Sequence, residues 1–309
     1  MDRGQGPARL LAAAALLLAV AADRPRLPIR EARWLKSPDL VADLTQLPSE
    51  CLDWPDDPAQ RESVAIGRAA FRSPLLLGGQ AARAGLSCAS CHRNGRTNPH
   101  FHFPGISGDP GTADVTASIM SEHRGDGVFN PKPIPDLGGD PAKLKVSRDP
   151  ARKDLERFIH GLIVEEFDGP EPPPAILDGV AAYVRRLSPQ ACPRGGTTPI
   201  TLDDSLFEVD TAMLLAEESL KRGDAASARV LIASARSALG RIDERFTDAR
   251  SHRLLRSADA DLRALRDSTS YSAAAFERWR RAWTGRKLQL RAGGARSLFA
   301  EKALRRLVN

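Results

Sequence analysis

The chain of 309 residues lacks several short motifs that identify common enzyme classes. It has no Gly-x-Ser-x-Gly sequence, which speaks against an α/β-hydrolase nucleophile. Gly138 and Gly139 are not followed by the Gly-Lys-Ser/Thr of a phosphate-binding loop. Only four cysteines occur, with one Cys-x-x-Cys pair and no His-x-x-x-His, which is too few ligands for a tetrahedral zinc site. Beyond residue 20 no apolar run is long enough to span a bilayer.

Two of these scarce cysteines belong to the sequence Cys88-Ala89-Ser90-Cys91-His92. This is the Cys-x-x-Cys-His pattern of covalent haem attachment. Each thiol can add to one vinyl group of the same porphyrin, and the histidine that follows is placed to bind the iron as its proximal ligand. A thioredoxin-type redox pair would follow a strand in a βαβ unit, and no such alternation is visible. The pattern therefore predicts one haem c, held by Cys88 and Cys91, with His92 as a metal ligand.

The first 22 residues have the layout of a secretory signal peptide. Arg3 and Arg9 precede an apolar run at 10–20, and Ala19 and Ala21 supply small residues for cleavage. The run is short for a membrane span, so an uncleaved anchor is the alternative. Covalent haem attachment of this kind takes place after export, which agrees with the motif. We therefore expect a soluble, periplasmic mature protein.

The other two cysteines, Cys51 and Cys192, stand on either side of the motif. In an oxidising compartment, two remaining thiols predict a disulfide, and two free buried thiols are the alternative. The bond would close a loop of about 140 residues, for which chain entropy gives on the order of 4–5 kcal/mol. It would join the two ends of one domain.

Proline and glycine are dense in residues 99–174, whereas no proline follows Pro199. We expect an all-α protein, with a cytochrome c-like haem domain at 23–197 and a small helical bundle with a basic C-terminal tail at 198–309. In the first domain we expect helices at 58–71, at 88–92, after Asp149-Pro150 and at 174–187. In the bundle we expect helices at about 206–220, 228–246, 254–265, 273–283 and 295–308.

The second axial ligand decides what such a haem does. Met120 is the only methionine between residues 23 and 197, and it is the first candidate for the distal iron ligand. His123 is the runner-up, because it lies about one helical turn further along. His100, His102 or no protein ligand are the remaining alternatives. Two arginines are candidate partners for the haem propionates: Arg96 and Arg124.

Positive charge is concentrated at the C-terminal end. Residues 271–309 hold ten Lys/Arg and two Asp/Glu, while the whole chain carries a net charge of only +6. Such a tail predicts a weak contact with a membrane surface or an acidic partner. Trp279 and Trp283 are expected to pack on the bundle, with the arginines between them in solvent. An exposed interfacial or partner-docking face is the alternative. Nucleic acid is not an expected partner, because the chain is expected to leave the cytoplasm.

The region from about residue 62 to residue 187 resembles the bacterial di-haem cytochrome c peroxidase family. Peroxidases of that family carry two haem motifs, but this chain has one, and a methionine followed by His-Asp-Gly is also absent. The resemblance therefore implies a mono-haem cytochrome built on one half of that architecture. The matching segments are Ile66–Phe71, Leu86–His92, Ile134–Leu137, Glu165–Phe167 and Leu177–Val184.

These observations favour electron transfer through one covalent haem, with a redox partner protein and no catalytic residue. The alternative is a haem-dependent peroxidase that needs an external electron donor, with His123 or Glu122 moving a proton. A third hypothesis is a binding or sensing module in which the helical bundle provides the docking part.

Overall fold

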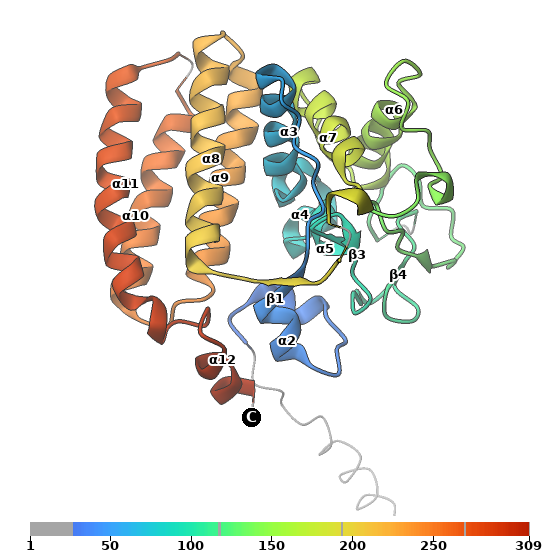
Figure 1. The fold of residues 1–309 in the computed structure, drawn as a ribbon, viewed down its shortest axis with the longest axis horizontal. Coiled ribbons are helices and arrows are strands. Elements are labelled where there is room, and N and C mark those ends of the chain that lie inside the picture. The colour runs from blue at the N-terminus through green and yellow to red at the C-terminus, as the bar shows by residue number, and fades with distance from the viewer. Residues whose placement is uncertain (1–26, 117–118, 193, 269, 309) are drawn as a thin grey trace, which may run out of the picture.

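The computed structural model describes residues 27–116, 119–192, 194–268 and 270–308 (Figure 1). The helical elements are η1 (Arg30–Trp34), α2 (Leu40–Thr45), α3 (Pro58–Phe71), η2 (Pro74–Leu76), α4 (Gly79–Ala84), α5 (Cys88–Cys91), η3 (Pro141–Lys143), α6 (Asp154–Gly161), η4 (Leu162–Glu166), α7 (Pro174–Arg186), η5 (Pro189–Ala191), α8 (Leu202–Lys221), α9 (Ala225–Asp243), α10 (Ala249–Arg266), α11 (Ala273–Gly293), η6 (Gly294–Arg296) and α12 (Glu301–Val308). The strands are β1 (Gln46–Pro48), β2 (His92–Arg93), β3 (Arg96–Thr97), β4 (Thr112–Ala113), β5 (Lys132–Pro133) and β6 (Thr197–Pro199).

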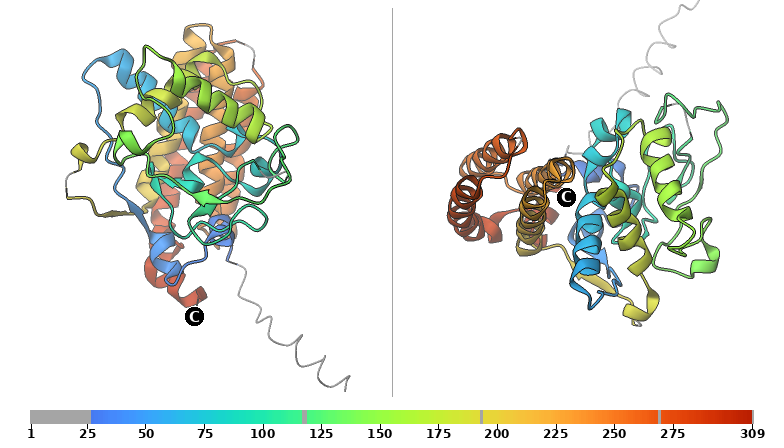
Figure 2. Two further views of the ribbon diagram at one scale, coloured as in Figure 1. Left: turned by 90° about the vertical axis from the view of Figure 1, so that its right-hand side faces the viewer. Right: turned by 90° about the horizontal axis from the view of Figure 1, so that it is seen from above.

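The helices confirm the predicted all-α class, and they stack in three pairs (Figures 1 and 2). Helices α10 and α11 form one side, α8 and α9 lie in the middle, and α3 and α7 lie on the other side. The strands form only short antiparallel pairs. The expected signal peptide at 1–22 lies outside the described residues. In the described part of the chain, no helix has the length and apolar character that a membrane crossing requires.

Helix α3 forms where the sequence predicts a helix over 58–71. Asp57 accepts a hydrogen bond from the backbone N–H of Gln60 at 2.8 Å, and Pro58 occupies the first helical position. Its partner α7 also begins at the expected proline, Pro174, and ends at Arg186 because Leu187 turns into an extended bridge with Leu52.

Helix α6 begins later than the sequence predicts. Asp149 accepts a hydrogen bond from the N–H of Ala151, which makes a local turn rather than a helix cap. The helix starts only at Asp154, after Lys153 adopts a positive φ of 56°. The proline at 150 therefore lies in the turn that precedes the helix.

Helices α8, α9, α10 and α11 each begin at a side chain that caps them. Thr201, Asp224, Asp248 and Ser272 each accept a hydrogen bond from the backbone N–H three residues later. Helix α11 runs ten residues beyond the expected end at 283, because Leu290 continues its buried face.

The two tryptophans of α11 pack inside the bundle, as expected. Trp279 and Trp283 are buried and their rings stack with centroids 6.0 Å apart. The indole N–H of Trp283 donates to Asp210 on α8 at 2.7 Å. These aromatic side chains are therefore part of the core and not of an exposed docking face.

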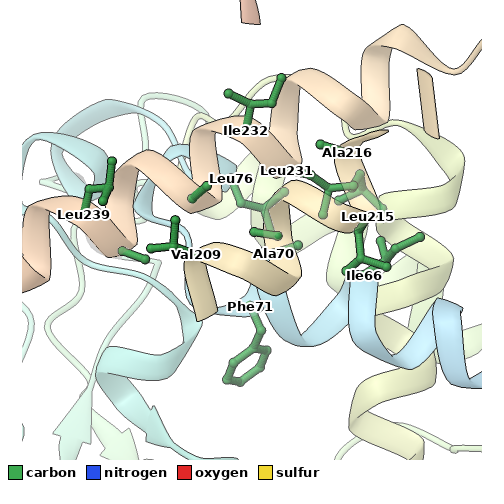
Figure 3. Packing of buried hydrophobic residues seen from close by; sticks show 14 of the residues in the cluster. Ile66, Ala70, Phe71, Leu76, Val209, Leu215, Ala216, Leu231, Ile232 and Leu239 are labelled. Carbon is green, nitrogen blue, oxygen red and sulfur yellow. The ribbon is translucent and has the colours of Figure 1, made fainter. Parts of the chain in front are cut away.

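The halves expected to form separate domains are closely joined. Strand β6 spans the expected boundary at 197 and pairs with β1, with Gln46 opposite Pro199. The predicted disulfide between Cys51 and Cys192 is confirmed. Buried side chains of both halves form one hydrophobic cluster, in which α3 and η2 pack against α8 and α9 (Figure 3).

Candidate functional site

The Cys-x-x-Cys-His motif begins as a single helical turn, α5. The backbone N–H of Ser87 donates to the hydroxyl of Ser90 at 3.0 Å, and the N–H of Ser90 donates to the side chain of Ser87, which closes a capping box. Two residues separate Cys88 from Cys91, so the helical turn places both thiols on the same side. Asn98 secures the end of the turn by donating from Nδ2 to the Ser90 carbonyl at 2.8 Å.

His92 follows α5 in a tight hairpin of β2 and β3. Asn94 and Gly95 form the turn, with positive φ angles of 49° and 75°. The ring Nδ1 of His92 lies 3.0 Å from the carbonyl oxygen of Pro135. A carbonyl only accepts, so Nδ1 carries the proton and Nε2 keeps its lone pair. Metal-binding histidines usually have this arrangement, in which one nitrogen is held by a carbonyl and the other binds the metal.

The electrostatic state of the motif also favours a neutral imidazole. Burial lowers the pKa of His92 to about 4, although the Pro135 hydrogen bond and the charge of Asp136 oppose the shift. The ring is therefore uncharged at neutral pH, which is the form that binds metal ions.

The surroundings of the two thiols favour their protonated form. Burial raises the pKa of Cys88 and of Cys91 to about 12. A catalytic or redox Cys-x-x-Cys pair instead has a thiol whose pKa is lowered, because the thiolate is the nucleophile. Among the described residues, no group of three His, Cys, Asp or Glu side chains could hold a metal ion without a further cofactor. These facts argue against the redox-pair and zinc alternatives.

An aromatic side chain of α3 lies beside the motif and packs against one of α7. The ring of Phe71 lies 6.4 Å from that of His92 and 5.1 Å from that of Tyr183, measured between centroids. The Tyr183 hydroxyl donates to Glu50 at 2.9 Å, so the polar end of this buried side chain has a partner. The sequence gives no indication that Tyr183 packs against Phe71.

The distal candidates lie in different surroundings. Met120 is buried in the hydrophobic core, with 1% of its surface exposed. His123 has a side chain that is 68% exposed and bound to Asp168, with Nδ1 2.9 Å from the carboxylate. His100 is bound in the same way to Asp43, at 2.6 Å.

The segment that carries His100 and His102 also pairs with the N-terminal part of the chain. The His102 N–H donates to the Trp34 carbonyl at 2.9 Å, and the His100 carbonyl accepts from the N–H of Lys36 at 2.8 Å. Of the sequence-predicted ligands, the structure therefore buries Met120 and gives His100 and His123 carboxylate partners.

The two arginines expected to bind propionates are already paired. Arg96 binds Asp136 with N–O distances of 2.8 Å, and Arg124 binds Glu165 at 2.6 Å. Arg148 differs, because its guanidinium donates to the carbonyls of Leu137 and Leu187. Within the described residues, Arg148 has no carboxylate partner and its Nε has no hydrogen-bond partner. It is a candidate propionate partner that the sequence did not single out.

A cavity of about 510 Å³ lies behind the motif, between the two halves of the protein. It is lined by Ala89 and Ser90, the residues between the two cysteines, and by Arg241 and Gly240 of α9. The cavity thus lies on the face of α5 away from the thiols. Charged side chains that line the cavity form ion pairs with one another. For example, Arg241 binds Glu208 at 2.8 Å.

Part of the basic tail is paired with acidic side chains of the bundle. Arg286 binds Asp261 of α10 at 2.7 Å, Lys287 binds Asp210 of α8 at 2.6 Å, and Arg280 binds Glu217 of α8. These pairs hold α11 on the bundle. The contact predicted for residues 271–309, with a membrane surface or an acidic partner, stays a prediction.

Comparison of the chain with protein-family models, with curated proteins and with solved structures gives no match. The resemblance to the di-haem cytochrome c peroxidase family therefore stays a prediction. The residues of the site and their surroundings carry the functional proposal.

Proposed function

We propose that this protein is a periplasmic c-type cytochrome that transfers electrons through one covalently bound haem. The observation that supports this most strongly is the hydrogen bond from His92 Nδ1 to the Pro135 carbonyl. It fixes the tautomer and the orientation of a neutral imidazole immediately after a Cys-x-x-Cys pair.

The residues present fit a haem. Cys88 and Cys91 would form the two thioether links, His92 would bind the iron through Nε2, and Pro135 would keep the ring in place. Phe71 and the surrounding apolar core would exclude water. When bound, the haem supplies a one-electron couple between ferric and ferrous iron.

Met120 is the proposed distal ligand, because it is the candidate that the fold buries. A thioether ligand raises the potential of the iron and suits an electron carrier. His123 is less suitable, because it would have to leave both solvent and Asp168. The disulfide Cys51–Cys192 agrees with an oxidising compartment, where the redox partner would also be found.

Covalent attachment is the first test. The exported protein is purified and extracted with acidified acetone, which removes only haem that is not covalently bound. We expect the haem to stay with the protein, and we expect the double variant Cys88→Ala/Cys91→Ala to lose it. The matched control is Cys51→Ala/Cys192→Ala, which also removes two cysteines and should keep its haem. Retention of haem by the first variant would overturn the proposal.

Absorption and magnetic circular dichroism spectra then separate the carrier from the enzyme. A low-spin, six-coordinate iron in both oxidation states supports electron transfer. A high-spin, five-coordinate ferric state, together with turnover of hydrogen peroxide and a reduced donor, would instead establish the peroxidase alternative.

A further inference from the structure

The hairpin that follows His92 holds the segment around Pro135 from both sides. The hydroxyl of Thr97 donates to the carbonyl of Ile134 at 3.0 Å, on one side of Pro135. On the other side, the guanidinium of Arg96 binds the carboxylate of Asp136, with Nε–Oδ1 and Nη2–Oδ2 distances of 2.8 Å. Two neighbouring residues of β3 therefore fix the two neighbours of the proline whose carbonyl holds His92.

Further bonds restrict the Asp136 carboxylate. The N–H of Gly138 donates to Asp136 Oδ1 at 2.9 Å and lies 3.2 Å from the carbonyl of Gly95 in the hairpin turn. Gly95 has a φ of 75°, and a Cβ there would lie 2.3 Å from Leu187. The turn thus depends on glycine, and it brings the hairpin into direct contact with residues 134–138.

The third nitrogen of the guanidinium reaches the disulfide. Arg96 Nη1 lies 3.3 Å from the sulfur of Cys51, which is bonded to Cys192. All three nitrogens of Arg96 are therefore engaged, and its plane is fixed. A lysine could not reproduce this arrangement, because it offers a single point charge.

The Arg96–Asp136 pair is too exposed to matter greatly for stability. The two side chains are 28% and 34% exposed, and ion pairs in such surroundings contribute between about 0 and 1 kcal/mol. Its geometry is nevertheless bidentate, and Gly138 and Cys51 make further contacts with Asp136 and Arg96. This combination points to a role in positioning rather than in holding the fold together.

Resting on the proposed function, we propose that Arg96 and Asp136 are positioning residues that set the His92–Pro135 hydrogen bond. A well-placed acceptor gives the imidazole more electron density, which stabilises ferric iron. Asp136 adds a negative charge near the ring, and Arg96 partly cancels it. The pair would thus fix the orientation of His92 and adjust the potential of the iron.

The test compares Asp136→Asn, Arg96→Gln, the double variant and Arg96→Lys in the ferrous, diamagnetic holoprotein. The exchange of the His92 Nδ1–H proton with solvent is followed by NMR. We expect roughly tenfold faster exchange in all four variants, because each loosens the segment that carries the acceptor. The control variants Arg286→Gln and Asp261→Asn break an ion pair between α10 and α11 and should leave this exchange unchanged.

The midpoint potential supplies a second readout. Asp136→Asn removes a negative charge and should raise the potential, whereas Arg96→Gln removes a positive charge and should lower it. Arg96→Lys keeps the charge and should stay closer to the parent protein. A simple loosening of the fold would move the potential of the single variants in the same direction.

The outcomes separate this inference from the proposed function. If the parent protein carries covalent haem and the variants match the controls in both exchange and potential, the positioning role is wrong and the cytochrome proposal stands. If the parent protein carries no covalent haem, both are overturned.

Discussion

Gly67 of α3 packs directly against the backbone of Gly179 of α7. A Cβ at position 67 would lie 1.8 Å from the carbonyl oxygen of Gly179, which is far inside van der Waals contact. The absence of side chains at this crossing lets the two helices approach closely. Their approach brings Tyr183 of α7 against Phe71 of α3, whose ring lies 6.4 Å from that of His92.

Replacing Gly67 with alanine should therefore destabilise the protein. The added methyl group has to push two backbones apart, and we expect a loss of at least about 2 kcal/mol in the free energy of unfolding. Urea unfolding followed by circular dichroism measures this loss. The control is Gly285→Ala on α11, where an added Cβ would have no neighbouring atom within 4 Å. This variant should raise the free energy of unfolding by up to about 1 kcal/mol. Equal stability of the two variants would show that the crossing is looser than described.

This crossing illustrates what the sequence could and could not predict about the fold. Asp57 and Pro58 predict the start of α3, because helix capping depends on residues that are close in sequence. Nothing local shows that Gly67 faces Gly179, since glycine inside a helix reads only as a weak helix former. The packing partner of α3 depends on three-dimensional contacts between segments that are far apart in sequence.

The site shows the same difference between local features, which the sequence predicts, and long-range contacts, which it does not. The motif Cys88–His92 is local, and it is visible without a structure. Pro135 lies 43 residues after His92, and no periodicity links the two. In the same way, the Asp168 that binds His123 lies 45 residues later. The disulfide was an exception among distant pairs, because only Cys51 and Cys192 remained once the motif was assigned.

Met120 can be tested as the distal ligand by changing its sulfur but not its volume. Met120→Leu keeps an apolar side chain of similar size, so it should preserve most of the stability and lose the spectrum of a methionine-ligated iron. Met120→Ala should lose the spectrum and, because the site is buried, also about 2–5 kcal/mol of stability. Absorption spectra and urea unfolding of the purified ferric protein provide both measurements.

His123→Ala is the matched control for these variants. Its ring is exposed and bound to Asp168, so the spectrum should be unchanged. If Met120→Leu kept the parent spectrum while His123→Ala changed it, the distal assignment would pass to His123.

The two halves are also joined by charges whose effect depends on pH. Arg72 of the first half lies 3.3 Å from Glu208 of α8, and Arg241 of α9 lies 2.8 Å from the same carboxylate. Burial alone would raise the pKa of Glu208, but Arg72 and Arg241 outweigh it and lower the pKa to about 2. A carboxyl whose pKa is depressed by folding stabilises the protein above its unfolded pKa of about 4.5.

This stabilisation should be lost as the pH falls from about 4.5 towards 2. Glu208→Gln should therefore lower the free energy of unfolding by about 2 kcal/mol at pH 7 and by much less at pH 3. Urea unfolding at a series of pH values measures the difference. Glu218→Gln, which removes only an exposed partner of Lys221, serves as the control and should be nearly neutral throughout. A cost at Glu208 that did not change with pH would argue against the ion pairs as its cause.

The disulfide should contribute to stability through the unfolded state. Cys51 and Cys192 are 141 residues apart, so the bond restricts a large part of the unfolded chain. Removing it in Cys51→Ala/Cys192→Ala should lower the free energy of unfolding by about 2–5 kcal/mol while the haem remains attached.

Urea unfolding compares this variant with the parent protein, each with and without a reducing agent. Reduction should bring the parent close to the variant and leave the variant unchanged. If reduction left the parent as stable as before, while mass spectrometry showed two free thiols, the bond would have no stabilising role. Loss of stability in the variant would then come from the packing of the sulfur atoms and from the Cys51–Arg96 contact.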